Sequence, residues 1–293
     1  MSGYPPDLDR WRRAARISAE ARDLGASLVV TGARRREVAD AIERYIRSKG
    51  AEPAFPANLS RNSEAAHFTP DPDDIGVFEA GDLVKVDVGA HLDGAIADTA
   101  TTVEVGGGRR HENLIRAVRD AVDAGVREVR SGVAVDTISV AIERAIHARG
   151  LKPVRNLTGH TIERYLLHAG KSIPNASGMS SASLREGEVV AIEPFATNGA
   201  GEIENGPFGH ILRFRNDPGP KDPVVAALYA RFRTLPFTTR WVDGEGRLHL
   251  AGAKRHLQSY PVFVERGRGL VAQAEHTVLV TAGGHELLTA SAS

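Results

Sequence analysis

Residues 87–100 read DVGAHLDGAIADTA, inside a longer β-prone run, GDLVKVDVGAHLDGAIADTATTV, at 81–103. The dipeptide Asp93-Gly94 interrupts this run, and Asp-Gly between two alternating apolar segments is a strong signal for a two-residue hairpin turn. The run therefore predicts a hairpin of two strands. Asp93 is then explained by the chemistry of the turn.

The two remaining acids of this stretch fall on one face of the predicted hairpin. With the turn at 93–94, Asp87 lies opposite Ala100 and diagonal to Asp98, so the two carboxylates lie within roughly 5–8 Å of each other. Alternation places the core residues on the other face, where they form a continuous apolar surface: Val84, Val86, Val88 and Val103.

Two neighbouring carboxylates repel each other, and burying either one without a partner is costly. Three arrangements relieve this: one acid stays protonated, a basic side chain arrives from elsewhere, or a divalent cation binds. A hairpin face on which both acids are solvated is the alternative that requires no site.

An internal repeat supports a site. AIERYIRSKG at 41–50 and AIERAIHARG at 141–150 are identical at six of ten positions, at an offset of 100. A proline and then an Asn-Leu pair follow each copy, namely Pro53 and Asn58-Leu59 in the first, and Pro153 and Asn156-Leu157 in the second.

The repeat extends to the hairpin. GDLVKVDVGA at 81–90 aligns with GEVVAIEPFA at 187–196, and this alignment places Asp87 on Glu193. Three matched segments in the same order indicate a duplicated unit of helices and a hairpin. The second hairpin should therefore contribute acids beside those of the first.

Two residues compete as the second acid of the second hairpin. Extending the offset from Asp98 leads to Glu204, whereas the apolar strand GLVAQAEHTVLV at 269–280 is a better hairpin partner and contains Glu275. The second reading makes residues 208–265, with their own helix signal, an insertion that splits the hairpin. The predicted organisation is one catalytic unit, 1–207 with 266–293, and an insertion subdomain, 208–265.

Composition restricts the kinds of protein this chain can be. Its 293 residues carry 37 Lys and Arg against 37 Asp and Glu, so no overall charge favours nucleic acid or anionic lipid. Cysteine is absent, so oxygen and imidazole must hold any metal. No signal peptide or membrane-spanning run is evident, and we expect a cytoplasmic protein. Helical periodicity is found at 8–25, 34–49, 111–131 and 135–149.

Histidines complete the donor set expected from the sequence. A lone histidine is more often structural than functional, but His67 and the pair His160 and His168 follow the two Asn-Leu positions of the repeat. They are therefore expected in comparable loops that face the hairpins. Carboxylates with an imidazole suit divalent ions such as Mn, Fe, Co or Zn.

These motifs resemble those of the type 2 methionine aminopeptidases. In length and in motif sequence the chain is most similar to the short archaeal forms of that family. The resemblance covers nearly the whole chain and rests on five segments: PAFPANLSRNSEAAHFTP (53–70), GDLVKVDVGAHLDGAIADTATTV (81–103), NLTGHTIERYLLHAGKSIPN (156–175), GEVVAIEPFAT (187–197) and VAQAEHTVLV (271–280). It implies an α/β (α+β) duplicated pita-bread fold with pseudo-twofold helix-plus-hairpin repeats and a mostly helical insertion.

The resemblance also implies roles for individual residues, and it favours Glu275 over Glu204. Two divalent ions (Co, Mn, Fe, Zn or Ni) are expected, with ligands Asp87, Asp98, His160, Glu193 and Glu275. His67 and His168 would contact the scissile peptide, and Glu193 would transfer the proton. The methionine pocket would be lined by Phe55, Pro56, Asn58, Leu167 and Phe195.

The activity implied is removal of the N-terminal methionine from nascent proteins whose second residue is small. The substrates are then nascent peptides, with room for transient ribosome contact, no membrane partner, no direct nucleic-acid function and a monomeric enzyme. Two alternatives remain: an Xaa-Pro aminopeptidase of the prolidase type, and a non-catalytic relative that binds ribosomes or RNA. The stretch 206–214 (GPFGHILRF) matches nothing assignable, so its contribution to the substrate site stays open.

Overall fold

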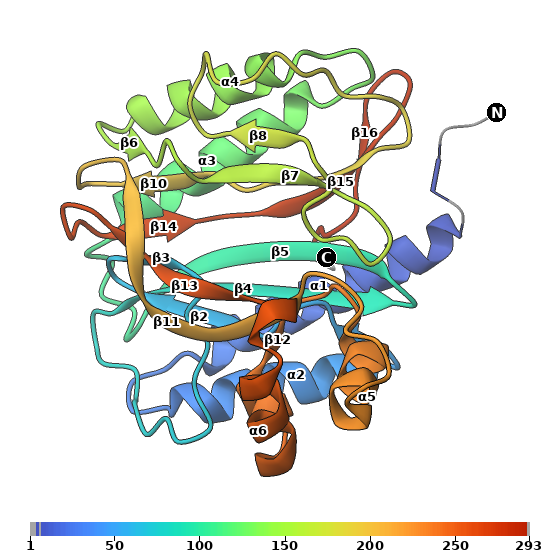
Figure 1. Ribbon diagram of the computed structural model, residues 1–293. Helices are drawn as coiled ribbons and strands as arrows, with labels where there is room; N and C mark the ends of the chain where they lie inside the picture. Colours follow the sequence, from blue (N-terminus) through green and yellow to red (C-terminus); the bar gives the residue numbers. More distant parts are fainter. Residues whose placement is uncertain (1–3, 6, 292–293) are drawn as a thin grey trace.

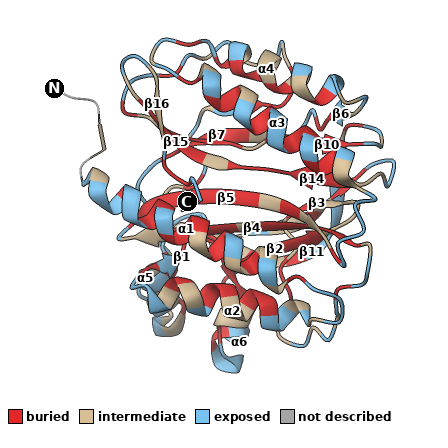
Figure 2. Cartoon of the chain, turned by 180° about the vertical axis from the view of Figure 1, so that it is seen from behind, coloured by how far each residue is buried: buried red, intermediate tan, exposed pale blue. Residues whose placement is uncertain are grey.

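The computed structural model describes residues 4–5 and 7–291, which form two related halves of helices and antiparallel sheets (Figure 1). Four long helices cover one side of the sheets (Figure 2): α1 (Leu8–Leu28) and α2 (Arg35–Ser48) from the first half, α3 (Glu112–Glu128) and α4 (Val135–His147) from the second. These bounds agree with the four helices expected from periodicity. None of the helices in this part of the chain is long and apolar enough to cross a bilayer.

Each helix pair is held by a stripe of apolar side chains. In α2 the stripe comprises Val38, Ile42 and Ile46, which pack on the valine face of the first hairpin. In the second half, Ile138 and Ile142 of α4 belong to the corresponding core. The valine faces of the sheets are therefore covered by helices, which leaves the acid faces for a site.

The first hairpin forms as predicted. Strands β4 (Leu83–Leu92) and β5 (Ala95–Glu104) pair antiparallel, with Asp87 opposite Ala100. Both turn residues have positive φ, 50° at Asp93 and 84° at Gly94, as a tight right-twisted hairpin requires. The short strands β1 (Glu52–Pro53) and β2 (Asn58–Arg61) extend this sheet on the other edge of β4.

The second half repeats this arrangement with the same register. It comprises β6 (Lys152–Pro153), β7 (Thr158–Ile162), β8 (Ser172–Pro174), β9 (Val189–Ile192), β10 (Phe195–Thr197), β14 (Val271–Gln273), β15 (His276–Val280) and β16 (His285–Leu287). These strands form a five-stranded sheet, β16-β15-β9-β7-β8, and a three-stranded sheet, β14-β10-β6. The pair Ser60–Lys85 of the first half becomes the observed pair His160–Ala191 when the offsets of 100 and 106 are applied. The duplicated pita-bread fold expected from the sequence is thereby confirmed.

The strict register corrects one detail of the sequence alignment. At an offset of 100, Asn58 corresponds to Thr158, the first residue of β7, and not to Asn156. Asn156 instead exchanges hydrogen bonds with the backbone of Ile203. Two extra residues separate the second Asn-Leu pair from its strand, so the match of the two Asn-Leu pairs was wrong as a structural alignment.

The two hairpins meet at the centre of the molecule. Ala100 and Glu275 form a backbone bridge between β5 and the strand pair β14–β15. On one side of it, the Thr277 hydroxyl donates to the Asp98 carbonyl at 2.7 Å and accepts from the Asp98 N–H at 2.8 Å. On the other side, the Thr102 hydroxyl donates to the Gln273 carbonyl at 2.6 Å and accepts from the Gln273 N–H at 2.8 Å. These reciprocal threonine bonds are related by the pseudo-twofold and fix the hairpins relative to each other.

The chain between β10 and β14 differs from the expected insertion. It contains helices α5 (Pro223–Phe232) and α6 (Gly244–Gly252), but also the strands β11 (Ile203–Phe214), β12 (Phe237–Thr238) and β13 (Leu257–Glu265). With β3 (Glu64–Ala66) these strands form a separate sheet. The expectation of a mostly helical segment missed this sheet, and the expected boundary at residue 208 falls inside β11.

Candidate metal centre

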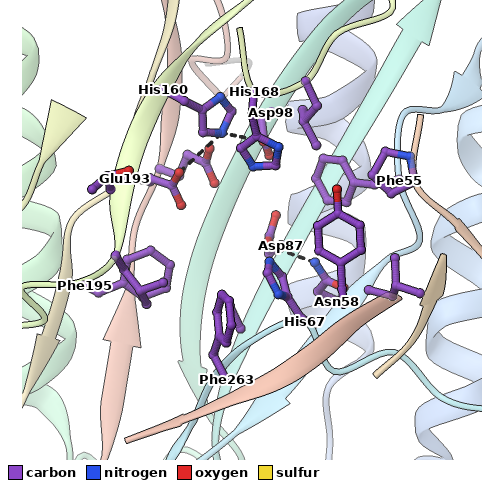
Figure 3. A pocket seen from close by; sticks show the side chains of 18 of the residues that line it. Phe55, Asn58, His67, Asp87, Asp98, His160, His168, Glu193, Phe195 and Phe263 are labelled. Carbon is purple, nitrogen blue, oxygen red and sulfur yellow. Dashed lines mark hydrogen bonds and ion pairs between the residues drawn. The ribbon is translucent and has the colours of Figure 1, made fainter. Parts of the chain in front are cut away.

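Five candidate ligands come together on the open faces of the two hairpins. Asp98, His160 and Glu275 each place one donor atom within 4.8 Å of the other two. The Nε2 atom of His160 is 3.4 Å from Glu193 Oε1 and 3.8 Å from Asp98 Oδ2. Figure 3 shows Asp87 on the side of this cluster nearer to His67 and Asn58. The alternative acid Glu204 lies elsewhere, paired with Arg268.

The acids are held where charge is unfavourable. Burial raises the pKa of Asp87 to about 7. Burial, and then the charge of Asp87, raise the pKa of Asp98 well above its usual range. Burial and the neighbouring carboxylates raise the pKa of Glu193 and of Glu275 as well. Asp98 and Glu275 are buried and Asp87 and Glu193 are partly buried, and no Lys or Arg of the described residues lines the cavity with them, so the site requires positive charge.

Unpaired oxygens show where that charge fits. Within the described part of the chain, Asp87 Oδ1, Asp98 Oδ1 and Glu275 Oε1 are buried without a hydrogen-bond partner. Such atoms are rare in folded proteins and call for a ligand. Burial lowers the pKa of His160 well below its usual range, so its ring is neutral and can bind a cation. The residues therefore fit divalent metal, and carboxylate with imidazole suits Mn, Fe, Co, Ni or Zn.

Two side-chain amides hydrogen-bond to acids of this cluster. Asn58 Nδ2 donates to Asp87 Oδ2 at 3.2 Å, and Gln273 Nε2 donates to Glu275 Oε2 at 3.3 Å. Asn58 reaches Asp87 because the two residues pair directly between β2 and β4. Gln273 was not predicted from the sequence. It precedes Glu275 by two residues, and strand alternation places residues two apart on the same face, so this spacing could have identified it.

Two further histidines flank the acid cluster. His67 has a left-handed backbone, φ 66°, which is uncommon for a residue with a side chain and is typical of positions fixed by function. Its ring packs 4.4 Å from Phe263 and 5.2 Å from Tyr260, and burial lowers its pKa to about 4. His168 lies at the mouth, 4.3 Å from the His160 ring, and desolvation with the charge of Arg213 lowers its pKa. Both rings are neutral at pH 7 and can donate through one nitrogen.

A cavity of about 260 Å³ opens over the acids (Figure 3). Its walls include all of the residues predicted for the site except Pro56, which is buried outside the lining. The sequence reasoning missed the rest of the lining: Ala66, Asn156, Leu157, Thr158, Ile211, Pro236, Tyr260 and Phe263. The strict offset of 100 could have identified Thr158, the counterpart of Asn58.

The unassigned stretch 206–214 has a defined place in the site. It forms most of β11, and its Ile211 lines the cavity beside Tyr260, with which it pairs across β11 and β13. Gly209 lies against the backbone of His67, where an added Cβ would be 2.6 Å from the His67 carbonyl oxygen. The stretch thus forms a wall of the cavity and also backs one of the flanking histidines.

The duplicated fold and its acid–imidazole centre define the class of pita-bread metallohydrolases. A sequence model of Metallopeptidase family M24 matches residues 9–282. The methionine aminopeptidase of Archaeoglobus fulgidus is 42% identical over 283 residues, which is 94% of this chain and 96% of that protein. That of Methanocaldococcus jannaschii is 38% identical and covers 99% of both chains. The chain therefore belongs to metallopeptidase family M24.

The fold likeness extends to solved structures. A methionine aminopeptidase from Thermotoga maritima matches with a TM-score of 0.73 over 97% of each chain, at 23% sequence identity. At that identity the match supports the fold alone.

Proposed function

We propose that this enzyme is a methionine aminopeptidase that removes the first residue of newly made proteins when the second residue is small. The observation that carries the proposal is the buried acid cluster beneath an apolar cavity flanked by two neutral histidines. The archaeal relatives over nearly the full chain support the choice of methionine. An Xaa-Pro peptidase would share the fold. The relatives described above, at 42% and 38% identity, are however methionine aminopeptidases.

We further propose that two divalent ions are held by Asp87, Asp98, His160, Glu193 and Glu275. Asp98 and Glu275 place donor atoms near His160, and Asp98 also interacts with Asp87, so these two acids would hold the ions together with the other three residues. The bound ions would supply Lewis acidity, which polarises both the peptide carbonyl and the attacking water. Which of Co, Mn, Fe, Zn or Ni acts in the cell is a matter for metal analysis.

The side chains of the site carry the remaining steps in this proposal. Glu193 takes a proton from the attacking water and passes it to the leaving amine, and burial raises its pKa, so it accepts a proton more readily than an exposed carboxylate. His67 and His168 donate hydrogen bonds to the substrate peptide as neutral imidazoles. A donor of this kind, placed where negative charge develops, contributes roughly 3–4 kcal/mol to catalysis.

The apolar wall selects the first residue. Phe55, Leu167, Phe195, Tyr260 and Phe263 are apolar or aromatic side chains that line the cavity, and in this proposal they hold the unbranched methionine side chain. Such a pocket discriminates by only about 1–3 kcal/mol per missing methylene. Selection for a small second residue then depends on crowding between the two histidines.

Other parts of the proposal concern the setting of the enzyme. We infer a monomer that acts in the cytoplasm, with transient ribosome contact through basic runs such as 33–36 and 108–110. The segment 208–265 is an insertion subdomain in this proposal, and the structure suggests that its sheet begins with β11 at Ile203.

Peptide cleavage under controlled metal content tests the function. Purified protein should cleave Met-Ala-Ser, lose this activity after thorough chelation, and regain it with Co or Mn, because the buried acids require a cation. Ala-Pro peptides should not be cleaved. Full activity after chelation, verified by elemental analysis, would refute the metal mechanism, and cleavage of Ala-Pro peptides alone would establish the prolidase alternative.

Gly209→Ala should lower kcat/KM by roughly 10- to 100-fold, the effect of a displacement of about 1 Å at a catalytic group. The new Cβ would meet two backbone oxygens, at 2.6 Å from His67 and 2.7 Å from Tyr260, so β11 must move and His67 with it. Gly252→Ala is the control, because its Cβ meets nothing within 4 Å. Steady-state kinetics on Met-Ala-Ser compares the two, and equal rates would show that β11 does not support His67.

A further inference from the structure

The repeated AIER motif contains a glutamate whose function the metal site does not explain. Glu43 of α2 is only 1% exposed, whereas its repeat counterpart Glu143 in α4 is partly open to solvent. A buried carboxylate is retained only when its partners compensate for desolvation. The partners of Glu43 come from two distant segments of the chain.

The first segment belongs to the insertion. Arg240 donates to both oxygens of Glu43, at 2.7 and 2.8 Å, and its side chain is 4% exposed. Trp241 Nε1 donates to Glu43 Oε2 at 2.6 Å, and Asp40 accepts a further bond from Arg240 at 2.6 Å. This forked ion pair is the type of contact that fixes direction as well as distance.

The second segment is the wall of the cavity. The Ala57 N–H donates to Glu43 Oε1 at 3.2 Å, and the Ala57 carbonyl accepts from Thr69 Oγ1 at 2.9 Å. Ala57 lies between Phe55, which lines the cavity, and Asn58, which hydrogen-bonds to Asp87. Both polar groups of this one residue are therefore held by Glu43 and its neighbours.

Arg240 reaches the other wall as well. Its Nε donates to the Pro70 carbonyl at 3.3 Å, and its Nη2 reaches Thr69 Oγ1 at 3.4 Å. Thr69 and Pro70 follow His67, whose left-handed backbone needs support from its surroundings. One guanidinium thus links the strand that carries Asn58 to the loop that carries His67.

The repeat offers a comparison within the same molecule. Glu143 accepts from the N–H of Ser177 at 3.1 Å, as Glu43 accepts from Ala57. Neither Ser177 nor Glu143 lines the cavity. The same helix position therefore fixes a loop in both halves, and in the first half that loop carries Phe55 and Asn58 of the cavity. In the second half, among the described residues, the loop of Ser177 lies outside the lining, and Glu143 approaches the cavity only through a 3.9 Å pair with the exposed Arg155.

We infer that Glu43, Arg240 and Trp241 form a positioning cluster through which the insertion sets the shape of the pocket for the substrate's first residue. This inference rests on the proposed aminopeptidase function. The cluster touches no substrate; it acts through Ala57 on Phe55 and Asn58. Its loss should weaken binding of the methionine side chain more than it slows the chemical step.

Two substitutions of different severity test this inference. Trp241→Phe removes one hydrogen bond to Glu43 and keeps a ring that stacks on Phe232. Glu43→Gln removes the charge that pairs with Arg240. We expect KM for Met-Ala-Ser to rise about threefold in the first and about tenfold in the second, with kcat changed less than about twofold. The inhibition constant of free L-methionine should rise in parallel.

The matched control is Glu143→Gln, which alters the equivalent helix position away from the cavity. It should leave KM and the methionine inhibition constant within about twofold of wild type. Unfolding temperatures of all variants identify simple destabilisation. If both Trp241→Phe and Glu43→Gln lower the unfolding temperature while KM stays at the wild-type value, the cluster is only structural and the inference is wrong.

The wild-type enzyme in the same assay separates this inference from the proposed function. If wild type fails to cleave Met-Ala-Ser, the aminopeptidase assignment itself fails. If wild type cleaves it and the two variants match its KM, the assignment stands and the positioning role is overturned. A fall in kcat with unchanged KM would also overturn it, because the pocket would then be intact.

Discussion

Asp98→Asn should abolish cleavage of Met-Ala-Ser, with kcat/KM lower by at least about 10³-fold, the scale of losing a group that acts at the reacting atoms. Asp98 is 5% exposed, has a donor atom within 4.8 Å of donors of His160 and Glu275, and interacts with the charge of Asp87. Asparagine keeps the size of the side chain but removes the charge that a shared ligand must supply. The backbone bonds of residue 98 to Thr277 do not involve the carboxylate, so the fold should persist.

The same substitution should make the metal-free protein more stable. Repulsion from Asp87 and burial both raise the pKa of Asp98, so its ionised form opposes folding at neutral pH. Replacing one of several buried like charges by a neutral amide is expected to stabilise by roughly 1–3 kcal/mol. Thermal unfolding in the presence of a chelator measures this change, and kinetics with saturating metal measures the loss of activity.

Asp93→Asn is the control, because it is the same substitution five residues away in the same hairpin. Asp93 lies in the exposed turn, where its carboxylate contacts Arg10, Arg164 and Tyr165. We expect its kcat/KM to stay within about twofold of wild type, since exposed pairs contribute little. Full turnover by Asp98→Asn in metal-defined buffer would contradict the proposed role of Asp98.

Strand alternation and turn signals in the sequence correctly predicted the acids that lie on the first hairpin. Alternation and Asp93-Gly94 specify the hairpin register, and that register alone places Asp87 and Asp98 on one face. The repeat then predicts that Glu193 lies at the position equivalent to Asp87, because the duplicated unit keeps its register through β7 and β9. Glu275 required the resemblance, since repeat arithmetic also led to Glu204.

The opposite wall of the cavity could not be predicted in this way. Tyr260 and Phe263 come from β13, whose pairing with β11 shifts register twice, between Asn205 and Phe208 and again between Phe208 and Ile211. These shifts interrupt the regular pairing of the two strands, so alternation does not predict which side chains face the cavity there. The burial of Glu43 was equally invisible, because Arg240 lies 197 residues further along the chain.

Metal affinity should rise steeply with pH, and this is the second large effect expected. Burial raises the pKa of Asp87 to about 7, and the pKa values of Asp98, Glu193 and Glu275 are raised in the same direction. In the metal-free protein Asp87 therefore still holds a proton at pH 5–6, where ordinary acids have lost theirs. A metal ion must displace such protons when it binds. Each proton released therefore adds a factor of about ten per pH unit to the pH dependence of the metal affinity.

Competition with a chromophoric chelator between pH 5 and pH 8 measures this dependence. We expect the dissociation constant to fall at least about 10-fold for each pH unit up to about pH 7, because the metal displaces the proton of Asp87 over this range. His160 does not add to the slope, because burial lowers its pKa and its ring is already neutral. A constant affinity across this range would show that the four acids are ionised before metal arrives, and the positive charge they require would then have to come from the protein itself.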